Sequence, residues 1–304
     1  MNFNFTNKFQ SKFEYDYSLS KLTWFKTGGN VKGYSYINNT EDLKEILLKI
    51  PNEIQIFVLG AGSNVLIRDN GFEGIVIKLG KEFNKIKIKD EKIYAGSGVL
   101  DSNLSKFALE NSLKNLEFYS GIPGTLGGAI KMNAGCYGSE TKNVIEGVKV
   151  LNRNAEEKLL KNFELGFDYR SSFISKDTII TEIIIPCNKG NKKDIKYKME
   201  EIISKRENTQ PLRVKTGGST FKNPKGFFAA KLIEDSGCKG LQVGDAIVSE
   251  KHANFIINTN KASAKNIEDL GKKIIDRVYS KFNILLDWEI KIIGKSWCEK
   301  VKKY

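Results

Sequence analysis

The chain has 304 residues, of which 40% are hydrophobic and 28% are charged, as in an ordinary globular protein with room for two or three domains. Its formal net charge of +13 favours acidic partners, either a nucleic acid or small anions such as nucleotides. The apolar runs are too short to span a bilayer, and residues 1–5 do not resemble the start of a signal peptide. We therefore expect a cytoplasmic protein with no membrane association.

The basic excess does not by itself predict nucleic-acid binding. Much of it comes from scattered lysines, such as those that alternate with isoleucine over residues 85–89, a pattern typical of a strand with one solvent-facing side. The sequence has no helix-turn-helix or RNA-binding signature. A nucleic-acid-binding protein is therefore only a remote alternative.

The four cysteines are widely spaced and form no C-x-x-C pair, which argues against a structural zinc or a redox dithiol. We expect free, buried thiols and no metal site. The residues concerned are Cys136, Cys187, Cys238 and Cys298.

The first third of the chain predicts one helix among short strands. Asn39 and Thr40 offer N-cap oxygens, apolar residues then recur at helical spacing, and Pro51 ends the helix. Asp101 offers a cap for a second helix. The expected strands cover residues 54–59, 65–67, 74–79, 86–88 and 93–95.

The middle of the chain carries a glycine-dense region over residues 121–138, strands at 148–151 and 178–185, and a helix at 192–206. We place a domain boundary near residues 205–211, so that the domains are 1–205 and 206–304.

The last third predicts a helix at 227–235, strands at 246–249 and 255–258, a long amphipathic helix at 263–282 and a final strand at 284–290. The mixture indicates an α+β fold rather than a regular βαβ alternation.

Three groups of glycines stand out, at Gly28-Gly29, at residues 60–64 and at residues 121–128. Glycine permits positive φ and close approach of the backbone, and successive N–H groups in such turns form a concave anion site. A pyrophosphate is the usual ligand of such a site, so three groups indicate a dinucleotide.

A Rossmann domain is the less favoured way to bind that dinucleotide. Gly60-Ala61-Gly62 follows an expected strand, but Val65 occupies the position of the third glycine of G-x-G-x-x-G. The residues that follow have strand character, whereas the Rossmann motif requires a helix there.

Several sequence segments stand out together between about residues 22 and 294. The segments are Leu22-Thr23-Trp24-Phe25-Lys26-Thr27-Gly28-Gly29, Leu59-Gly60-Ala61-Gly62-Ser63-Asn64-Val65-Leu66, Gly121-Ile122-Pro123-Gly124-Thr125-Leu126-Gly127-Gly128-Ala129 with Asn133-Ala134-Gly135-Cys136-Tyr137-Gly138, Tyr169-Arg170-Ser171-Ser172-Phe173, Gly217-Gly218-Ser219-Thr220-Phe221-Lys222-Asn223-Pro224, Ala230-Lys231-Leu232-Ile233-Glu234, Lys251-His252-Ala253-Asn254-Phe255 and Leu286-Asp287-Trp288-Glu289-Ile290. In type and in order, these segments resemble the motifs of the MurB-type reductases, the UDP-N-acetylenolpyruvoylglucosamine reductase family.

The resemblance implies a vanillyl-alcohol-oxidase-type FAD-binding domain of two subdomains, divided near residues 80–85, and a C-terminal α+β substrate domain. The last strand would return Glu289 to the active site. Because the single histidine, His252, lies in the substrate domain, we expect non-covalent FAD. The residues that the resemblance assigns to FAD are Gly60, Ala61, Gly62, Ser63, Asn64, Gly121, Ile122, Pro123, Gly124, Thr125, Gly128, Ala129, Asn133 and Gly135.

By the same resemblance, the reaction is NADPH-dependent reduction of the enolpyruvyl group on a UDP-sugar. Arg170 would hold the substrate carboxylate, Ser219 would donate the proton and Glu289 would assist at the developing enolate. The planar, permanently charged guanidinium suits a carboxylate. His252 is expected to be structural.

Tyr169, Lys222, Asn223 and Gln210 are the expected substrate contacts. Only 48 residues lie between Arg170 and Ser219, and none resembles the tyrosine-bearing insertion of some relatives, so the chain resembles the shorter-loop type. The expected partners are the UDP-sugar and NADPH, in a monomer or weak oligomer that binds no nucleic acid. Another flavin oxidoreductase of the same fold is the nearer alternative.

Overall fold

The computed structural model describes residues 12–295, which form two compact units. The first unit takes residues 12–16, 32–60 and 74–203 of this range, and the second takes 17–31, 61–73 and 204–295. The second unit therefore combines the C-terminal third with two segments from the N-terminal part of the chain.

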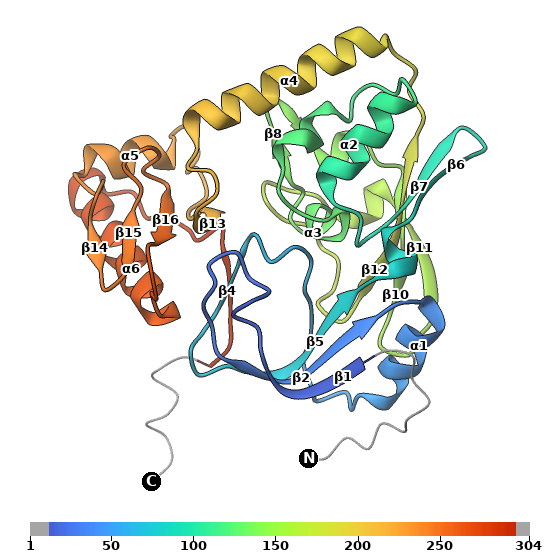
Figure 1. Ribbon diagram of the computed structural model, residues 1–304, viewed down its shortest axis with the longest axis horizontal. Coiled ribbons are helices and arrows are strands. Elements are labelled where there is room, and N and C mark those ends of the chain that lie inside the picture. Colours follow the sequence, from blue (N-terminus) through green and yellow to red (C-terminus); the bar gives the residue numbers. More distant parts are fainter. Residues whose placement is uncertain (1–11, 296–304) are drawn as a thin grey trace. The chain divides into compact units, whose positions relative to one another are not determined.

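The first unit begins with a four-stranded sheet in the order β1-β2-β5-β3, formed by β1 (Lys12–Ser18), β2 (Asn30–Ile37), β5 (Phe72–Leu79) and β3 (Ile56–Val58). Helix α1 (Thr40–Lys49) packs on this sheet through Leu43, Ile46 and Leu47 (Figure 1). Asn39 caps the helix, since its side chain accepts a hydrogen bond from the Asp42 N–H at 2.8 Å. The predicted helix and its cap are thereby confirmed.

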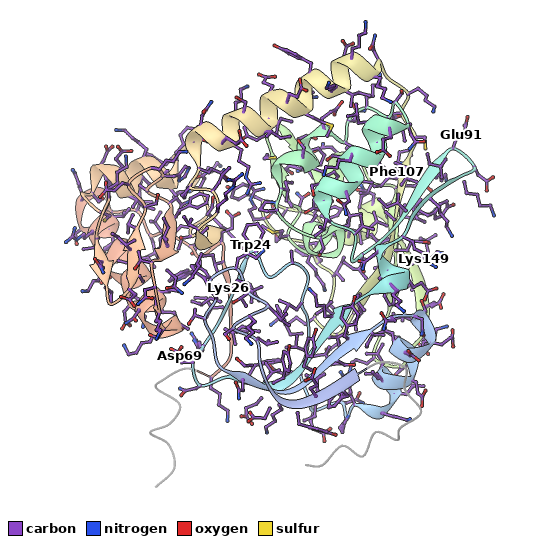
Figure 2. The ribbon with its side chains drawn as sticks, in the orientation of Figure 1. Trp24, Lys26, Asp69, Glu91, Phe107 and Lys149 are labelled. Carbon is purple, nitrogen blue, oxygen red and sulfur yellow. The ribbon has the colours of Figure 1, made fainter. Side chains whose placement is uncertain are left out.

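A five-stranded antiparallel sheet follows, in the order β11-β10-β12-β7-β6. Asp90 and Glu91 both have positive φ, which makes the tight turn of the β6–β7 hairpin that Figure 2 shows at Glu91. The strands are β6 (Ile86–Lys89), β7 (Lys92–Gly96), β10 (Gly147–Leu151), β11 (Glu157–Lys161) and β12 (Ile179–Pro186).

Short helices cover this sheet and bury the largest cluster of apolar side chains, with Tyr119 fully buried among them (Figure 1). The covering elements are α2 (Asp101–Glu110), η2 (Glu117–Gly121), α3 (Leu126–Lys131) and the small hairpin of β8 (Gly135–Cys136) and β9 (Ser139–Glu140). The remaining short elements of the unit are η1 (Lys81–Asn84), η3 (Thr141–Asn143) and η4 (Asn162–Leu165), and α4 (Lys192–Thr209) ends it.

The second unit is built on a four-stranded antiparallel sheet in the order β13-β16-β15-β14, against which α5 and α6 pack (Figure 1). A separate parallel pair joins β4 (Val65–Ile67) to β17 (Lys291–Ile293). The other elements are β13 (Lys215–Ser219), α5 (Ala229–Asp235), β14 (Gln242–Val243), β15 (Ala246–Val248), β16 (Phe255–Asn258) and α6 (Ala264–Phe282).

Two local predictions were wrong. The final strand is β17 rather than residues 284–290, because within 284–290 only Trp288 forms a bridge, to Phe221. Asp101 is the first residue of α2 rather than its cap, which is Leu100, and its side chain is buried. Helix α3 was not predicted, because its glycines obscure the helical pattern.

The described cysteines, Cys136, Cys187 and Cys238, are free thiols, and Cys298 lies outside the described residues. Only Cys238 is fully buried, while the other two are half-buried, which departs from the expected burial. None of the helices within residues 12–295 combines the length and apolar composition that a bilayer crossing requires.

Candidate flavin and substrate site

The turn over residues 60–64 connects β3 to β4 and presents unused donors. Within the described part of the chain, no backbone N–H of Gly60, Ala61, Gly62 or Ser63 donates a hydrogen bond to a protein group. Gly62 has φ +70°, and a Cβ there would lie 2.3 Å from the Leu22 carbonyl oxygen. Consecutive unused N–H groups in a glycine turn form an anion site, which fits a pyrophosphate.

The opening motif supports the same turn from its other side. The Trp24 N–H donates to the Gly62 carbonyl at 2.9 Å. Trp24 and Lys26 lie close together on this segment, as Figure 2 shows. Gly28 and Gly29 pack against the strand that leaves the turn, because a Cβ at Gly29 would lie 2.3 Å from the Asp69 carbonyl oxygen. The first glycine group thus supports the second and does not form a separate anion site.

The second predicted cofactor loop, residues 121–129, is held by the segment 97–101. Asp101 N–H donates to the Gly124 carbonyl at 3.1 Å, and the N–H groups of Leu126 and Gly127 donate to Val99 and Ser97 at 2.9 and 2.8 Å. These bonds leave the N–H groups of Gly124 and Thr125 without a partner among the described residues. Within the first unit the loop also approaches Gly60, since a Cβ there would lie 2.4 Å from Thr125 Oγ1.

A buried carboxyl group lies directly beside this loop. Asp101 is 0% exposed, and neither of its carboxyl oxygens has a hydrogen-bond partner within residues 12–295. A Cβ at Gly124 would lie 2.6 Å from Asp101 Oδ2. Desolvation raises the pKa of Asp101 well above its ordinary value, which favours the neutral form of the group and weakens any repulsion of an anion on the loop.

Asn133 and Gly135 belong to the network that positions Arg170. Asn133 is fully buried, and its side-chain amide donates to Glu140 Oε2 at 2.8 Å and to the Asp168 carbonyl at 3.1 Å. Arg170 Nη2 donates to the Gly135 carbonyl at 3.0 Å. The Asn133 side chain is thus engaged within the protein, and the structure brings it together with Gly135 and Arg170.

Arg170 adopts φ +55°, in a tight turn closed by the reciprocal backbone hydrogen bonds of Asp168 and Ser171. A positive φ is uncommon for a residue other than glycine, and such strain concentrates at functional sites. The guanidinium lies 5.2 Å from the centre of the Tyr169 ring. Tyr169 itself is 40% exposed, so its ring is accessible to a ligand.

Lys131, which sequence reasoning missed, holds the segment that follows Arg170. Its ammonium donates to the carbonyls of Ser175 at 2.7 Å and Ile174 at 3.2 Å, and its own carbonyl accepts from Ser172 Oγ at 3.0 Å. Desolvation lowers the pKa of Lys131 to about 8, against the opposing charge of Asp177. A lysine inside a small helix gave no signal of this role in the sequence.

Glu140 interacts electrostatically with Arg170. Desolvation raises the pKa of Glu140, but hydrogen bonds from Lys142 and Asn133, together with the charges of Lys142 and Arg170, lower it by more. The carboxylate is therefore ionised and adds an electrostatic restraint on the guanidinium.

Ser219 is the last residue of β13 and lies opposite Phe255 of β16. The ladder is irregular between Thr216 and Ser219, where Gly218 has φ +77°. The chain beyond Ser219 is fixed by Asn254, whose side chain accepts from the Phe221 N–H at 2.9 Å and donates to the Phe221 carbonyl at 2.8 Å. The Asn254 side chain thus binds the backbone groups of Phe221 that a neighbouring strand would otherwise bind. It thereby fixes the chain just after Ser219, at the end of the sheet.

Glu289 is half-buried and is held at its backbone. Its N–H donates to the Thr220 carbonyl at 2.9 Å, and its carbonyl accepts from Asn64 Nδ2 at 3.1 Å. Because Thr220 directly follows Ser219, the structure brings Ser219, Glu289 and Asn64 together within the second unit. The sequence separates these residues widely and could not show this.

The remaining predicted substrate residues have structural contacts. Asn223 Oδ1 accepts from the Ala229 N–H at 2.9 Å and so caps the start of α5. Gln210 Oε1 accepts from Arg206 Nε at 3.2 Å, at the end of α4. The Lys222 N–H donates to the Asp287 carbonyl at 2.8 Å. This bond joins two backbone groups and does not involve the Lys222 side chain.

His252 packs edge-on against Phe255, with ring centres 4.7 Å apart, and its Nδ1 is buried without a partner among the described residues. Desolvation lowers its pKa, so the ring is neutral near pH 7. Its surroundings are those of a packed side chain, and within residues 12–295 no carboxylate or hydroxyl forms a hydrogen bond that would align the ring as a general base.

Comparison with known proteins agrees with this geometry. A family model described as an FAD binding domain matches residues 31–159, and the model of the UDP-N-acetylenolpyruvoylglucosamine reductase C-terminal domain matches residues 210–293. The UDP-N-acetylenolpyruvoylglucosamine reductase of Rickettsia bellii is 42% identical over 94% of this chain and 95% of its own length. The reductase of Rickettsia typhi is 43% identical over 94% of this chain and 97% of its own length.

The crystal structure of the UDP-N-acetylenolpyruvylglucosamine reductase (MurB) from Thermus caldophilus superposes with a TM-score of 0.81 at 34% identity. It covers 94% of this chain and 99% of its own. On this likeness, the chain belongs to the UDP-N-acetylenolpyruvoylglucosamine reductase family of oxidoreductases and carries an FAD-binding domain.

Proposed function

We propose that the chain reduces UDP-N-acetylglucosamine enolpyruvate to UDP-N-acetylmuramate in peptidoglycan precursor synthesis, with FAD as cofactor and NADPH as the source of electrons. The observation that carries the proposal is the link between Ser219 and Glu289. The carbonyl of Thr220, the residue after Ser219, accepts the Glu289 N–H at 2.9 Å, which puts a hydroxyl and a carboxyl group on neighbouring strands of backbone.

When FAD is bound non-covalently, its flavin supplies the hydride for the enolpyruvyl double bond. Arg170 binds the substrate carboxylate through the planar fork of its guanidinium. Ser219 Oγ donates the proton to the carbon that does not receive the hydride. Glu289, acting through a proton that its carboxyl group carries or shares, stabilises negative charge that develops at the enolate.

The glycine turns support the cofactor assignment. Residues 60–63 offer four unused N–H donors, and the loop at Gly124 and Thr125 offers two more. We infer that these groups bind the FAD diphosphate and that Tyr169, Lys222, Asn223 and Gln210 contact the UDP-sugar. The exposed ring of Tyr169 supports this role best, whereas Asn223 and Gln210 already have protein partners.

The experiment separates the two half-reactions in a Ser219→Ala variant. Flavin reduction by NADPH, followed anaerobically at the visible flavin band, should keep the wild-type rate. Reoxidation by UDP-N-acetylglucosamine enolpyruvate should slow by at least about a hundredfold, the size of a general-acid contribution. Equal loss of both half-reactions would contradict the proton-donor role, and a wild-type protein that binds no FAD would overturn the whole proposal.

A further inference from the structure

We propose that the ammonium group of Lys78 binds the diphosphate of FAD directly, as the cationic partner of the turn at Gly60. The proposal rests on the proposed placement of the FAD diphosphate at this turn, and it adds a residue that the sequence motifs do not include.

Lys78 stands out by its position in β5. The strand is otherwise closely packed around it, since Ile75, Val76 and Ile77 are 0% exposed and Leu79 is 8% exposed. A half-buried lysine in such a run weakens the local packing, and departures of this kind concentrate at functional sites. Solubility therefore does not explain why a lysine occupies position 78, and a functional role does.

The parallel pairing of β3 with β5 brings Lys78 to the turn. Val58 lies opposite Ile77, and the Leu59 N–H donates to the Ile77 carbonyl at 2.8 Å. One residue further along both strands, Lys78 Nζ donates to the Gly60 carbonyl at 2.8 Å. Register alone thus fixes the ammonium beside the first glycine of the predicted pyrophosphate turn.

The ammonium keeps donors available for a ligand. It has three N–H bonds, and within residues 12–295 only the one to Gly60 is used. No carboxylate of the described residues lies within ion-pair distance of it. Desolvation lowers the pKa of Lys78, and no acidic group of the described residues offsets the cost of burying its charge.

The surroundings favour a strong acid anion as the missing partner. Gly60, whose carbonyl binds the ammonium, has an unused N–H of its own, and so does Thr125, whose Oγ1 would lie 2.4 Å from a Cβ at Gly60. Asp101, whose carboxyl group lies beside Gly124, has its pKa raised by desolvation, which favours the neutral form that leaves the lysine charge uncancelled. One cation with several neutral donors is the composition that a diphosphate requires.

The test compares ligands with and without the diphosphate. Dissociation constants of FAD, ADP, adenosine and riboflavin are measured by titration of the FAD-depleted full-length protein, for wild type, Lys78→Met and Lys78→Arg. The Met variant should bind FAD and ADP about 10–100-fold more weakly, and adenosine and riboflavin should be unchanged. The Arg variant should recover most of the loss, and the salt dependence of FAD binding should be smaller in the Met variant.

Lys87→Met is the matched control, since it removes one positive charge from an exposed strand position of the same unit. Equal weakening of ADP and adenosine by Lys78→Met would mean a structural role for Lys78 and would overturn the proposal. Unchanged FAD affinity would overturn it too, while leaving the proposed function intact. A wild type that binds no FAD would overturn both.

A second measurement does not depend on the folding of a variant. Amine-reactive labelling of the wild-type protein, read out by mass spectrometry, should show Lys78 protected by FAD and by ADP and not by adenosine. Labelling of Lys78 that FAD leaves unchanged would contradict direct contact.

Discussion

The side-chain amide of Asn64 donates a hydrogen bond to the backbone carbonyl of Glu289 at 3.1 Å, across 225 residues of sequence. The same Asn64 accepts the Lys291 N–H at its own backbone carbonyl, at 3.0 Å. One residue of the glycine turn therefore fixes the backbone on both sides of Ile290. Within the second unit, the position of the Glu289 carboxyl depends on the turn that is expected to hold FAD.

The first prediction follows from that bond. In Asn64→Ala, the backbone at Glu289 loses its side-chain donor, and reoxidation of reduced flavin by the enolpyruvyl sugar should slow about tenfold, the effect of losing one hydrogen bond of about 1.4 kcal/mol. Flavin reduction by NADPH should change much less. Rapid-mixing measurements of the two half-reactions distinguish these effects, and an unchanged reoxidation rate would show that Asn64 does not position Glu289.

Lys131 provides a prediction with a pH signature. Lys131→Met removes the bonds to the Ile174 and Ser175 carbonyls and loosens the turn that carries Arg170, so kcat/KM for the sugar should fall about tenfold. Because the pKa of Lys131 is lowered to about 8, wild-type kcat/KM should decline as pH rises through that value, and the variant should lack this decline. Lys176→Met is the control, because Lys176 is an exposed lysine that directly follows Ser175 in the segment that Lys131 holds.

Asp101 predicts an effect on stability that depends on pH. Its pKa is raised in the folded state, so above about pH 4 the unfolded chain releases a proton that the folded chain retains, and stability falls with rising pH. Asp101→Asn stays neutral and should escape this loss. The free energy of unfolding of the variant should therefore exceed that of wild type by a margin that grows from pH 4 upward, by at most about 1.4 kcal/mol per pH unit. Urea unfolding at several pH values and fixed FAD concentration measures it, and a margin that shrinks would contradict the sign.

Gly60 and Thr125 predict a coupled pair. A Cβ at Gly60 would lie 2.4 Å from Thr125 Oγ1, so Gly60→Ala should displace the turn and weaken FAD binding about tenfold. In the Gly60→Ala, Thr125→Ala double variant the collision is absent, and part of the affinity should return. Additive losses in the double-mutant cycle would show that the two residues do not meet.

Asp69, labelled in Figure 2, joins the segment after β4 to the start of α6. Its two carboxyl oxygens accept the N–H groups of Ala264 and Lys265, each at 2.9 Å. Asp69→Ala should lower the free energy of unfolding by about 1–2 kcal/mol, through the loss of a charged helix cap. Asp69→Asn should lose less, since it keeps one acceptor, and equal losses in urea unfolding would exclude a contribution from the charge.

Local patterns in the sequence identified the elements with clear periodicity. Helix α6 follows the predicted apolar spacing, and Ser263, the residue at which the helix was expected to begin, is its N-cap. The glycine motifs located the turns, because close approaches such as that of Gly62 to Leu22 leave no room for a side chain. By contrast, the bounds of β2 and the existence of α3 were not predicted. Their polar residues and glycines show neither the alternation of a strand nor the apolar spacing of a helix.

The site was predictable only as separate motifs. Arg170, Ser219 and Glu289 were found through family resemblance, and nothing in their local sequence distinguishes them from surface residues. Residues that act by tertiary contact, such as Lys131 and Asn254, gave no sequence signal, because their hydrogen-bond partners lie far along the chain. Lys78 is visible in the sequence as a charged residue within an apolar run. Its position beside Gly60, however, follows only from the register between β3 and β5.

The pairing of β4 with β17 has a consequence for synthesis of the protein on the ribosome. Val65 to Ile67 are made early, yet their partner strand, Lys291 to Ile293, is made only after the whole of the first unit and most of the described part of the second. The segment 61–73 must therefore wait, with its apolar strand unpaired, while the first unit has all of its residues by position 203. Loop closure over such a length is slow, and this interval is when the nascent chain depends most on chaperones and is most exposed to aggregation.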